Sequence, residues 1–312
     1  MAKNIKIDRH RWGILYCPKL GALSPQRRWR EIRDYLKEKS VEYDYIQSED
    51  YSSLARQAKM LADNGYETIV VVGGDGALQD VINGVMSSEN YARVTLGIIP
   101  NGIANDYSSY WGLPLHDYKK AVDYIITRRV RSVDVGCCEY SVDGTNVKRY
   151  FLNVLNLGLT ARVVEFANIK RYLFTRLAST LRSLFFLLFC RQNFNMRFRL
   201  NSQQVNGKFM MLSIGSSRGY GMTPSAVPYN GWLDVSAIRM PKFFGMIQGL
   251  YMVYKRKIMN YELMVPFRTT DIYIESVDGA PAAIDGRTFA PTFPMRVTVL
   301  PEAIKLIIPT KI

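Results

Sequence analysis

The pattern of apolar and polar positions predicts alternating strands and helices over the first 130 residues. Residues 69–72 are four consecutive β-branched residues, as expected for a strand that is buried on both faces. The order of elements predicts a parallel sheet with helices on both faces. The expected strands are residues 13–16, 43–47, 69–72 and 95–99, and the expected helices are residues 26–39, 52–64 and 77–86.

The pattern changes after residue 131, where strands follow one another mostly without helices between them. Such a run is typical of an antiparallel β-rich domain. We therefore predict two domains, residues 1–131 and residues 132–301, the second with helical insertions. The strands expected in the second domain are residues 150–157, 194–200, 208–214, 232–238, 271–275 and 295–300.

Histidine and cysteine usage excludes several classes of site. Only two histidines occur, His10 and His116, and neither lies in a recognisable catalytic context, which disfavours a Ser-His-Asp triad or a multi-histidine zinc site. The four cysteines form no CxxC pair, which disfavours zinc ribbons and disulfide scaffolds. Free cysteines and an N-terminus without an apolar core indicate the cytoplasm. The longest strongly apolar run, residues 184–190, is far shorter than a membrane span.

The net charge of +14 is concentrated in two segments. Residues 166–200 contain seven Lys or Arg, residues 239–261 contain five, and neither segment contains an acid. Within them, residues 171–189 and 243–257 fit basic amphipathic helices, which suit an anionic membrane surface. Alternatively, their apolar faces cover the β domain and their charges are solvated. Nucleic acid is disfavoured because no recognition module is present.

A glycine-rich corner joins the buried strand at residues 69–72 to the helix that follows it. Gly73, Gly74 and Gly76 let an anion approach the backbone amides at the helix N-terminus, and Asp75 could serve a metal ion or act as a base. The corner matches neither a Walker A loop nor GxGxxG, and no lysine occurs between residues 59 and 119. A polyphosphate bound here would therefore need a divalent metal. The alternative is a tight turn with a solvated aspartate.

A second corner, residues 99–106, follows the next buried strand. Ligands gather at the carboxyl ends of parallel strands, so the two corners are expected to share a site. Asn105 and Asp106 could hydrogen-bond a nucleotide or hold Mg²⁺ through oxygen atoms. The alternative is an Asx-rich turn that caps the next helix.

These corners and two later segments resemble the diacylglycerol kinase catalytic-domain family, the bacterial lipid kinases related to sphingosine and ceramide kinases. The resemblance rests on GGDG after the β-branched strand, on GIIPNGIANDYSSYWGLP, on GYGMTPSAVPYNGWLDV, and on IDGR followed by PEAIKLIIP. It implies a Rossmann-like ATP-binding domain, onto which residues 302–312 pack back, and a C-terminal antiparallel β-sandwich domain for the lipid substrate.

The implied reaction transfers the γ-phosphoryl group of ATP, with Mg²⁺, to a lipid hydroxyl such as that of diacylglycerol. The protein would act at the inner face of an anionic membrane, with a homodimer as one possible assembly. The resemblance assigns catalytic roles to Asp75 and Asp285, and a structural Mg²⁺ to Asp234. The residues that it assigns to nucleotide binding are Gly73, Gly74, Asp75, Gly76, Ala77, Pro100, Gly102, Asn105, Asp106 and Gly286.

Several positions depart from the family pattern. Ala77 and Ile103 stand where the family has threonine, Cys17 where it has asparagine, and Arg287 where it has a glutamate proposed as general base. Tyr229-Asn230 replaces two aspartates of the metal segment. These departures leave open a catalytically weak or inactive relative that binds lipid or nucleotide, and also a kinase for a soluble alcohol such as NAD.

Overall fold

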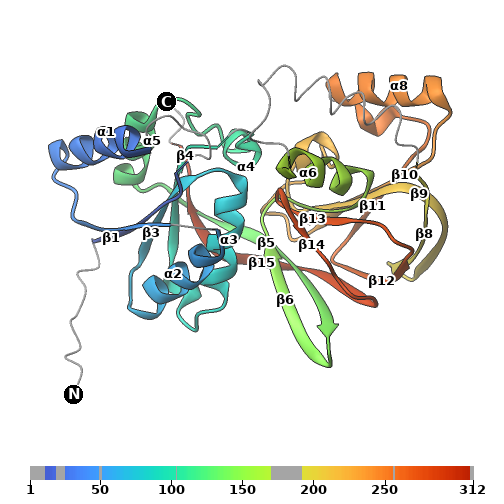
Figure 1. Ribbon diagram of the computed structural model, residues 1–312, viewed down its shortest axis with the longest axis horizontal. Helices are drawn as coiled ribbons and strands as arrows, with labels where there is room; N and C mark the ends of the chain where they lie inside the picture. The colour runs from blue at the N-terminus through green and yellow to red at the C-terminus, as the bar shows by residue number, and fades with distance from the viewer. Residues whose placement is uncertain are drawn as a thin grey trace. The chain divides into compact units, whose positions relative to one another are not determined.

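The computed structural model describes residues 11–18, 25–48, 51–102, 104–169, 192–255 and 257–309 (Figure 1). The chain divides into two compact units. Unit 1 comprises Met1–Val133 and Glu302–Ile312, and unit 2 comprises Asp134–Pro301. The division after Val133 lies close to the predicted boundary at residue 131, and the last residues of the chain belong to the first unit.

Unit 1 is a parallel sheet with helices on both faces, as predicted. Its strands run in the order β2-β1-β3-β4, and Lys305 and Leu306 of β15 add a further parallel partner to β4. Figure 1 shows α1 and α5 on one face and α2 and α3 on the other. The elements are β1 (Trp12–Tyr16), α1 (Pro25–Glu38), β2 (Tyr43–Gln47), α2 (Tyr51–Asp63), β3 (Thr68–Gly73), α3 (Asp75–Met86), β4 (Thr95–Pro100), α4 (Asp106–Tyr110) and α5 (Tyr118–Thr127).

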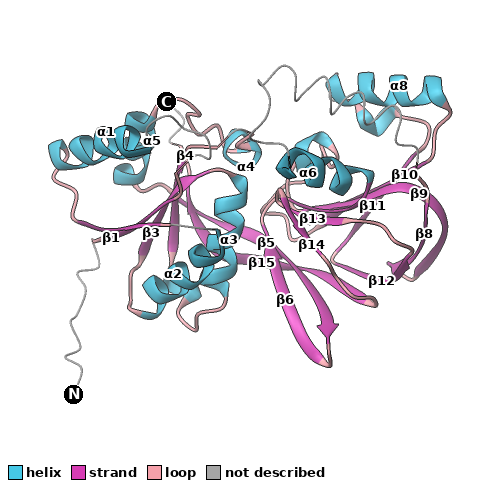
Figure 2. Ribbon diagram, in the orientation of Figure 1, coloured by secondary structure: helices cyan, strands magenta, loops and turns pink. Residues whose placement is uncertain are grey.

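Unit 2 is an antiparallel β domain in which strands form most of the structure (Figure 2). Its strands run in the order β14-β13-β7-β9-β8-β12-β15, and β10 pairs with both β9 and β11. The strands are β5 (Val130–Val142), β6 (Thr145–Phe151), β7 (Val154–Gly158), β8 (Phe194–Leu200), β9 (Gln203–Gly215), β10 (Leu233–Arg239), β11 (Met264–Thr269), β12 (Asp271–Val277), β13 (Ala282–Ile284), β14 (Arg287–Phe289) and β15 (Met295–Ile307). Among the described residues, the α-helices α6 (Leu159–Ile169) and α8 (Phe243–Tyr254) interrupt them.

The strands of unit 2 bury one face in an apolar core. In β8 the residues alternate strictly between buried and exposed, and Phe194, Met196, Phe198 and Leu200 all belong to this core. A strand that covers a core with one face only is expected to alternate in this way.

Some sequence expectations for the helices and strands need correction. The single strand expected at residues 150–157 is two strands, β6 and β7, because the backbone amides between them bind a carboxylate, Asp285, instead of a neighbouring strand. Several elements were not expected, among them β5, β11, β13, β14, α5 and α6. The basic helix expected at residues 171–189 lies outside the described residues. Within the residues that are described, no helix combines the length and the hydrophobicity of a transmembrane segment.

Candidate functional site

The first glycine-rich corner lies where β3 ends and α3 begins. Gly74 is the N-cap of α3 in an extended conformation, and its carbonyl accepts hydrogen bonds from the amides of Ala77 and Leu78, at 3.0 Å each. A Cβ atom on Gly73 would lie 2.6 Å from the Cβ of Ala77. The turn is therefore closed tightly by its own backbone, and it leads directly into the positive end of the helix dipole.

The two predicted corners are in direct backbone contact. The amide of Asn101 donates to the Gly73 carbonyl at 2.8 Å. A Cβ atom on Gly102 would lie 2.4 Å from the Cα of Gly74, and one on Gly74 would lie 2.8 Å from the Cα of Gly102. Glycine is required at both positions because two main chains meet there. The expectation that the corners share one site is thus consistent with the geometry of unit 1.

Asp75 joins the first corner to the helix that follows the second. Its carboxylate accepts hydrogen bonds from the amides of Asp106, at 3.0 Å, and Tyr107, at 3.2 Å. These amides lie in the first turn of α4, where no carbonyl of the helix can receive them. Asp75 therefore caps α4 and fixes the second corner, so it is not the solvated aspartate of the alternative interpretation.

Asn105 closes the second corner from within. Its backbone is left-handed, with φ of 49°, and its buried side chain forms two hydrogen bonds with Gly102: Oδ1 accepts from the amide at 2.9 Å, and Nδ2 donates to the carbonyl at 3.1 Å. Pro100 is the last residue of β4 and pairs with Gly73. The structure thus brings together Gly73, Gly74, Asp75, Gly76, Ala77, Pro100, Gly102, Asn105 and Asp106 in one part of unit 1.

What this corner offers to a ligand is main-chain amides at the start of α3. Lysine and arginine are absent from residues 73–77 and 100–106. A polyphosphate bound at these residues would therefore be held by amides and the helix dipole, and these two segments would contribute no basic side chain.

In unit 2, Asp285 and Gly286 form the two-residue turn between β13 and β14. Their φ angles are 44° and 82°, and the flanking residues Ile284 and Arg287 pair across the hairpin. Two residues with positive φ define a type I′ turn, for which Asp-Gly is a preferred sequence. The dipeptide Asp-Gly after the apolar run of β13 is thus a hairpin signal that is visible in the sequence itself.

The buried Asp285 carboxylate binds three consecutive main-chain amides. It accepts from Leu152 at 2.8 Å, from Asn153 at 3.2 Å and from Val154 at 2.7 Å, and the Asp285 amide donates in return to the Val154 carbonyl at 3.1 Å. Both oxygens are thus engaged within the protein. The geometry therefore makes Asp285 a positioning residue for the segment between β6 and β7.

Asn153 extends this network and was not predicted. Its side chain is buried, and its Oδ1 accepts a hydrogen bond from the Gly219 amide at 2.9 Å. Gly219 begins the glycine-rich segment that the resemblance identified, and the neighbouring Tyr220 hydroxyl lies 3.4 Å from where a Cβ of Gly286 would be. Two of the matched segments of unit 2 therefore meet around Asp285.

Asp234, which the resemblance assigns to a structural Mg²⁺, is paired with Arg268 instead. Its oxygens accept from Nε at 2.7 Å and from Nη2 at 3.3 Å, and hydrogen bonding to this carboxylate raises the pKa of the guanidinium. The Asn230 side-chain oxygen accepts from the Trp232 amide at 3.0 Å, within its own turn. Among the described residues, no three His, Cys, Asp or Glu gather as a metal site. These residues do not fit a metal, because arginine already supplies the cation.

We expect that a chelator such as EDTA leaves the melting temperature of the protein unchanged. Arg268→Met should destabilise it by about 2 kcal/mol, because Asp234, at 9% side-chain exposure, would keep a charge without its partner. Thermal and urea unfolding measure both effects.

The matched control for Arg268→Met is Arg296→Met, which breaks the more exposed pair with Asp271 on a neighbouring strand and should have a much smaller effect. A fall in melting temperature on addition of EDTA to the wild type would contradict the assignment of Arg268 as the resident cation.

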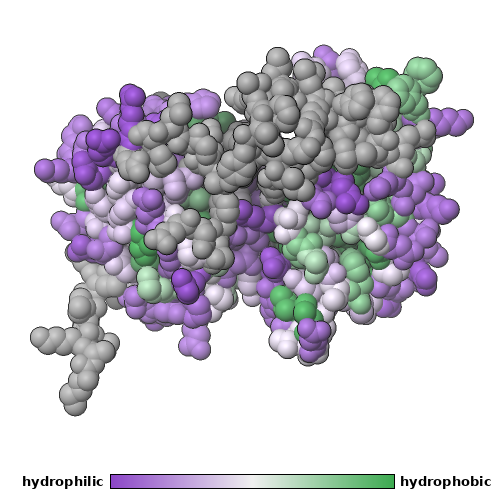
Figure 3. All heavy atoms as spheres, in the orientation of Figure 1, coloured by the Kyte–Doolittle hydropathy of each residue, from purple (hydrophilic) through white to green (hydrophobic). Residues whose placement is uncertain are grey.

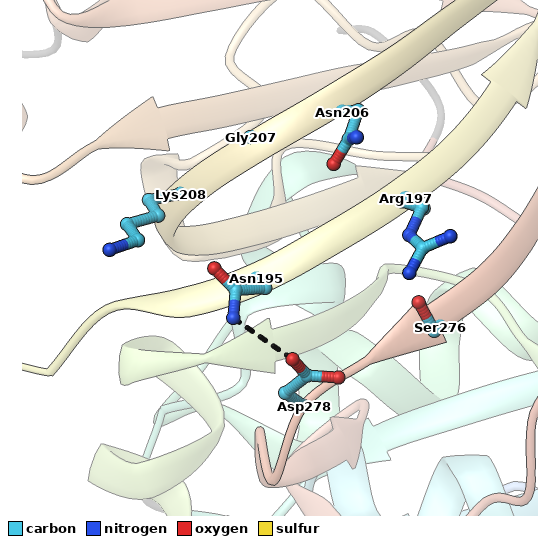
Figure 4. A pocket seen from close by; sticks show the side chains of 7 residues that line it. All are labelled: Asn195, Arg197, Asn206, Gly207, Lys208, Ser276 and Asp278. Atoms are coloured by element: carbon cyan, nitrogen blue, oxygen red, sulfur yellow. Dashed lines mark hydrogen bonds between the residues drawn. The ribbon is translucent and has the colours of Figure 1, made fainter.

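A cavity of about 410 Å³ lies elsewhere in unit 2, on the outer face of β8, β9 and β12 (Figure 4). Its lining is polar, and the Asn195 side chain donates to the Asp278 carboxylate at 3.0 Å. The lining residues are Asn195, Arg197, Asn206, Gly207, Lys208, Ser276 and Asp278. None of them belongs to the predicted site.

Comparison with known proteins finds a family match for each part of the chain. Residues 11–138 match the diacylglycerol kinase catalytic domain, and residues 153–308 match the YegS C-terminal NAD kinase beta sandwich-like domain. The chain is 24% identical to a diacylglycerol kinase of Bacillus subtilis (strain 168), over 73% of this chain and 74% of that protein. It is 23% identical to a diacylglycerol kinase of Mycobacterium tuberculosis (strain ATCC 25618 / H37Rv), over 78% of each.

Solved structures share the fold. A diacylglycerol kinase from Bacillus anthracis str. Sterne superposes with a TM-score of 0.73 at 18% identity, covering 97% of this chain and 99% of that one. Yeast NADH kinase in complex with NADH is more distant, with a TM-score of 0.51 at 10% identity over 96% of this chain and 84% of that one. The predicted α/β class, with a parallel-sheet unit followed by a β-sandwich-like unit, is confirmed.

Proposed function

Because the chain belongs to the diacylglycerol kinase catalytic-domain family, we propose that it transfers the γ-phosphoryl group of ATP to a lipid hydroxyl such as that of diacylglycerol. The observation that carries this proposal is the contact between the corners at Gly74 and Gly102. Glycine at both positions lets the two main chains approach each other at the start of α3, where main-chain amides suit a phosphate group.

Unit 1 would bind the nucleotide chiefly through its main chain. The amides of the first turn of α3 would receive phosphate oxygens, and Asp75 and Asn105 would hold the second corner in place, through α4 and Gly102 respectively. Mg²⁺ would arrive bound to ATP as part of the substrate, and would neutralise phosphate charge. Asp106, in the first turn of α4, would be the candidate carboxylate ligand of the second corner for this cation.

In this proposal Asp285 acts through position and is not required as the base. Phosphoryl transfer relies mostly on positioning and on charge stabilisation, whereas general-base assistance contributes about 10²–10⁴-fold. Asp285 would support the reaction by fixing residues 152–154, and through Asn153 the turn at Gly219. Arg287, in the position of the family's glutamate, would lower the rate rather than abolish it.

The test is transfer of ³²P from labelled ATP to a panel of lipids that includes diacylglycerol, ceramide and sphingosine, with NAD as a soluble acceptor. We expect label in a lipid product. Label in NAD alone would overturn the lipid assignment, and absence of label in every acceptor would overturn the kinase assignment. Titration calorimetry with ATP and Mg²⁺ reports nucleotide binding separately from turnover.

A second candidate is a lipid- or nucleotide-binding relative with little or no kinase activity. It is favoured by two departures from the family pattern. Arg287 stands where the family has a glutamate, and Ala77, which is buried and close to Gly73, stands where the family has threonine. Arg287→Glu discriminates between the two: a large gain in turnover indicates a slow kinase, whereas nucleotide binding without any gain favours the binding protein.

A further inference from the structure

Helix α8 of unit 2 has one face in the protein and one face exposed. On the inner side, Met246 and Gly249 are buried against Tyr261, whose ring lies 3.4 Å from where a Cβ of Gly249 would be. The Tyr261 hydroxyl donates to the Gly245 carbonyl at 2.9 Å. Met246 and Tyr261 belong to an apolar cluster with Met210, Met211, Ile238 and Met264. These contacts anchor the helix rigidly to the β domain.

The outer face of α8 consists of large apolar and aromatic side chains. Phe244 is 82% exposed, Ile247 46%, Tyr251 55% and Tyr254 80%. Spacings of three and four residues place the four on one side of the helix. We call this set the α8 outer face. In Figure 3, hydrophobic atoms gather at the upper right, over the position of α8 in Figure 1.

Exposed lysines flank the α8 outer face at both ends. Lys242 is the N-cap of the helix, and Lys255 and Lys257 follow its last residue. The Lys255 ammonium lies 5.7 Å from the centre of the Tyr251 ring and 5.8 Å from that of Tyr254. The sequence from residue 239 to residue 261 contains no acid.

This charge differs from that of two arginines on the outer face of the β8–β12–β15 sheet, each of which is paired with an acid. There, Arg199 pairs with Glu275 at 2.9 Å, and Arg296 pairs with Asp271. The lysines around α8 are therefore a local excess of positive charge next to exposed apolar surface.

We propose that the α8 outer face is the surface by which this protein docks onto an anionic lipid bilayer. Phenylalanine and isoleucine would enter the acyl region, tyrosines would lie at the level of the headgroups, and lysines would contact lipid phosphates. Charge favours this partner over a second copy of the chain, because apposed α8 helices would bring the lysine clusters together. The choice of partner rests on the proposed lipid-kinase function, but the test does not require activity.

The test is co-sedimentation with vesicles of phosphatidylcholine, with and without phosphatidylglycerol. We expect the wild type to bind the anionic vesicles, and Ile247→Glu to lower the partition coefficient at least about tenfold. Lys255→Gln combined with Lys257→Gln should lower binding to anionic vesicles by about 25-fold, at about fivefold per charge. The matched control is Ile126→Glu on α5 of unit 1, where the side chain is 43% exposed, and it should bind as the wild type does.

Further measurements separate the possible outcomes. Circular dichroism and thermal unfolding establish that Ile247→Glu is folded, and Tyr254→Glu serves as a second variant of the same face. Failure of the wild type to bind vesicles, or unchanged binding by both variants, would overturn the proposal. It would also be overturned by a wild type that sediments as a dimer without lipid while Ile247→Glu sediments as a monomer.

The same variants distinguish docking from catalysis. Phosphorylation of a short-chain diacylglycerol dissolved as monomers should be unaffected by Ile247→Glu, whereas activity on vesicles should fall with binding. If no acceptor is phosphorylated but vesicle binding still depends on α8, docking is supported and the kinase assignment fails.

Discussion

Gly102→Ala is expected to abolish binding of ATP and Mg²⁺ and to destabilise the protein by about 2–4 kcal/mol. The added Cβ would lie 2.4 Å from the Cα of Gly74 and 2.6 Å from Oδ1 of Asn105. The Gly74 Cα belongs to the main chain at the N-cap of α3. The backbone therefore cannot make room for the added Cβ without moving the start of that helix. Titration calorimetry and urea unfolding measure the two effects.

The matched control for this substitution is Gly207→Ala in β9. There the nearest atom to the added Cβ would be a Phe209 ring carbon at 3.4 Å, an ordinary contact, and the backbone does not need a positive φ. We expect unchanged nucleotide binding and little change in stability. If Gly102→Ala behaved like this control, the close contact between the corners would not be required for the site.

Asp285→Ala is expected to cost about 3–5 kcal/mol of folding free energy and to abolish activity. Three buried amides, those of Leu152, Asn153 and Val154, would lose their acceptor. An unpaired buried amide costs about 1–3 kcal/mol, and partial access of water would reduce the sum. Urea unfolding gives the stability, and the labelled-ATP assay gives the activity.

Two further substitutions at this position separate its possible roles. Asp285→Asn retains one acceptor oxygen and tolerates the left-handed backbone, so it should lose less stability than Asp285→Ala. Asp285→Gly suits the φ of 44° but removes the acceptor, so it should remain strongly destabilised. An Asp285→Asn protein as stable as the wild type but without turnover would instead indicate that Asp285 takes part in the chemistry.

The elements of unit 1 were predictable because local pattern and tertiary environment agree there. Strands such as residues 69–72 are buried on both faces, so their sequence is apolar throughout, and the glycines after them mark the ends. All four predicted strands and all three predicted helices of this unit are present. The later strands were harder to predict from the sequence. The strands β13 and β14, for example, have only three residues each and are defined by the turn between them.

The roles of the polar residues were less accessible from sequence. Residue type and spacing select Asp75, Asn105 and Asp285 as candidates for metal or base chemistry. Their partners are backbone amides, and which amides a carboxylate reaches depends on long-range folding: 131 to 133 residues separate Asp285 from the amides that it binds. Similarly, nothing local to Asp234 indicates that Arg268, on the neighbouring strand, neutralises it.

The segment from Glu302 joins unit 1 although the rest of that unit lies before Asp134, and this has a consequence for biosynthesis. The edge of β4 is covered by Lys305 and Leu306, and the amide of Ile308 donates to the Arg129 carbonyl at 2.9 Å. During translation the strands β1–β4 therefore emerge with an open edge at β4, which stays exposed until residues 305 and 306 have been synthesised. Open edges of this kind invite pairing with other chains. Truncation before residue 305 should thus yield fragments that aggregate.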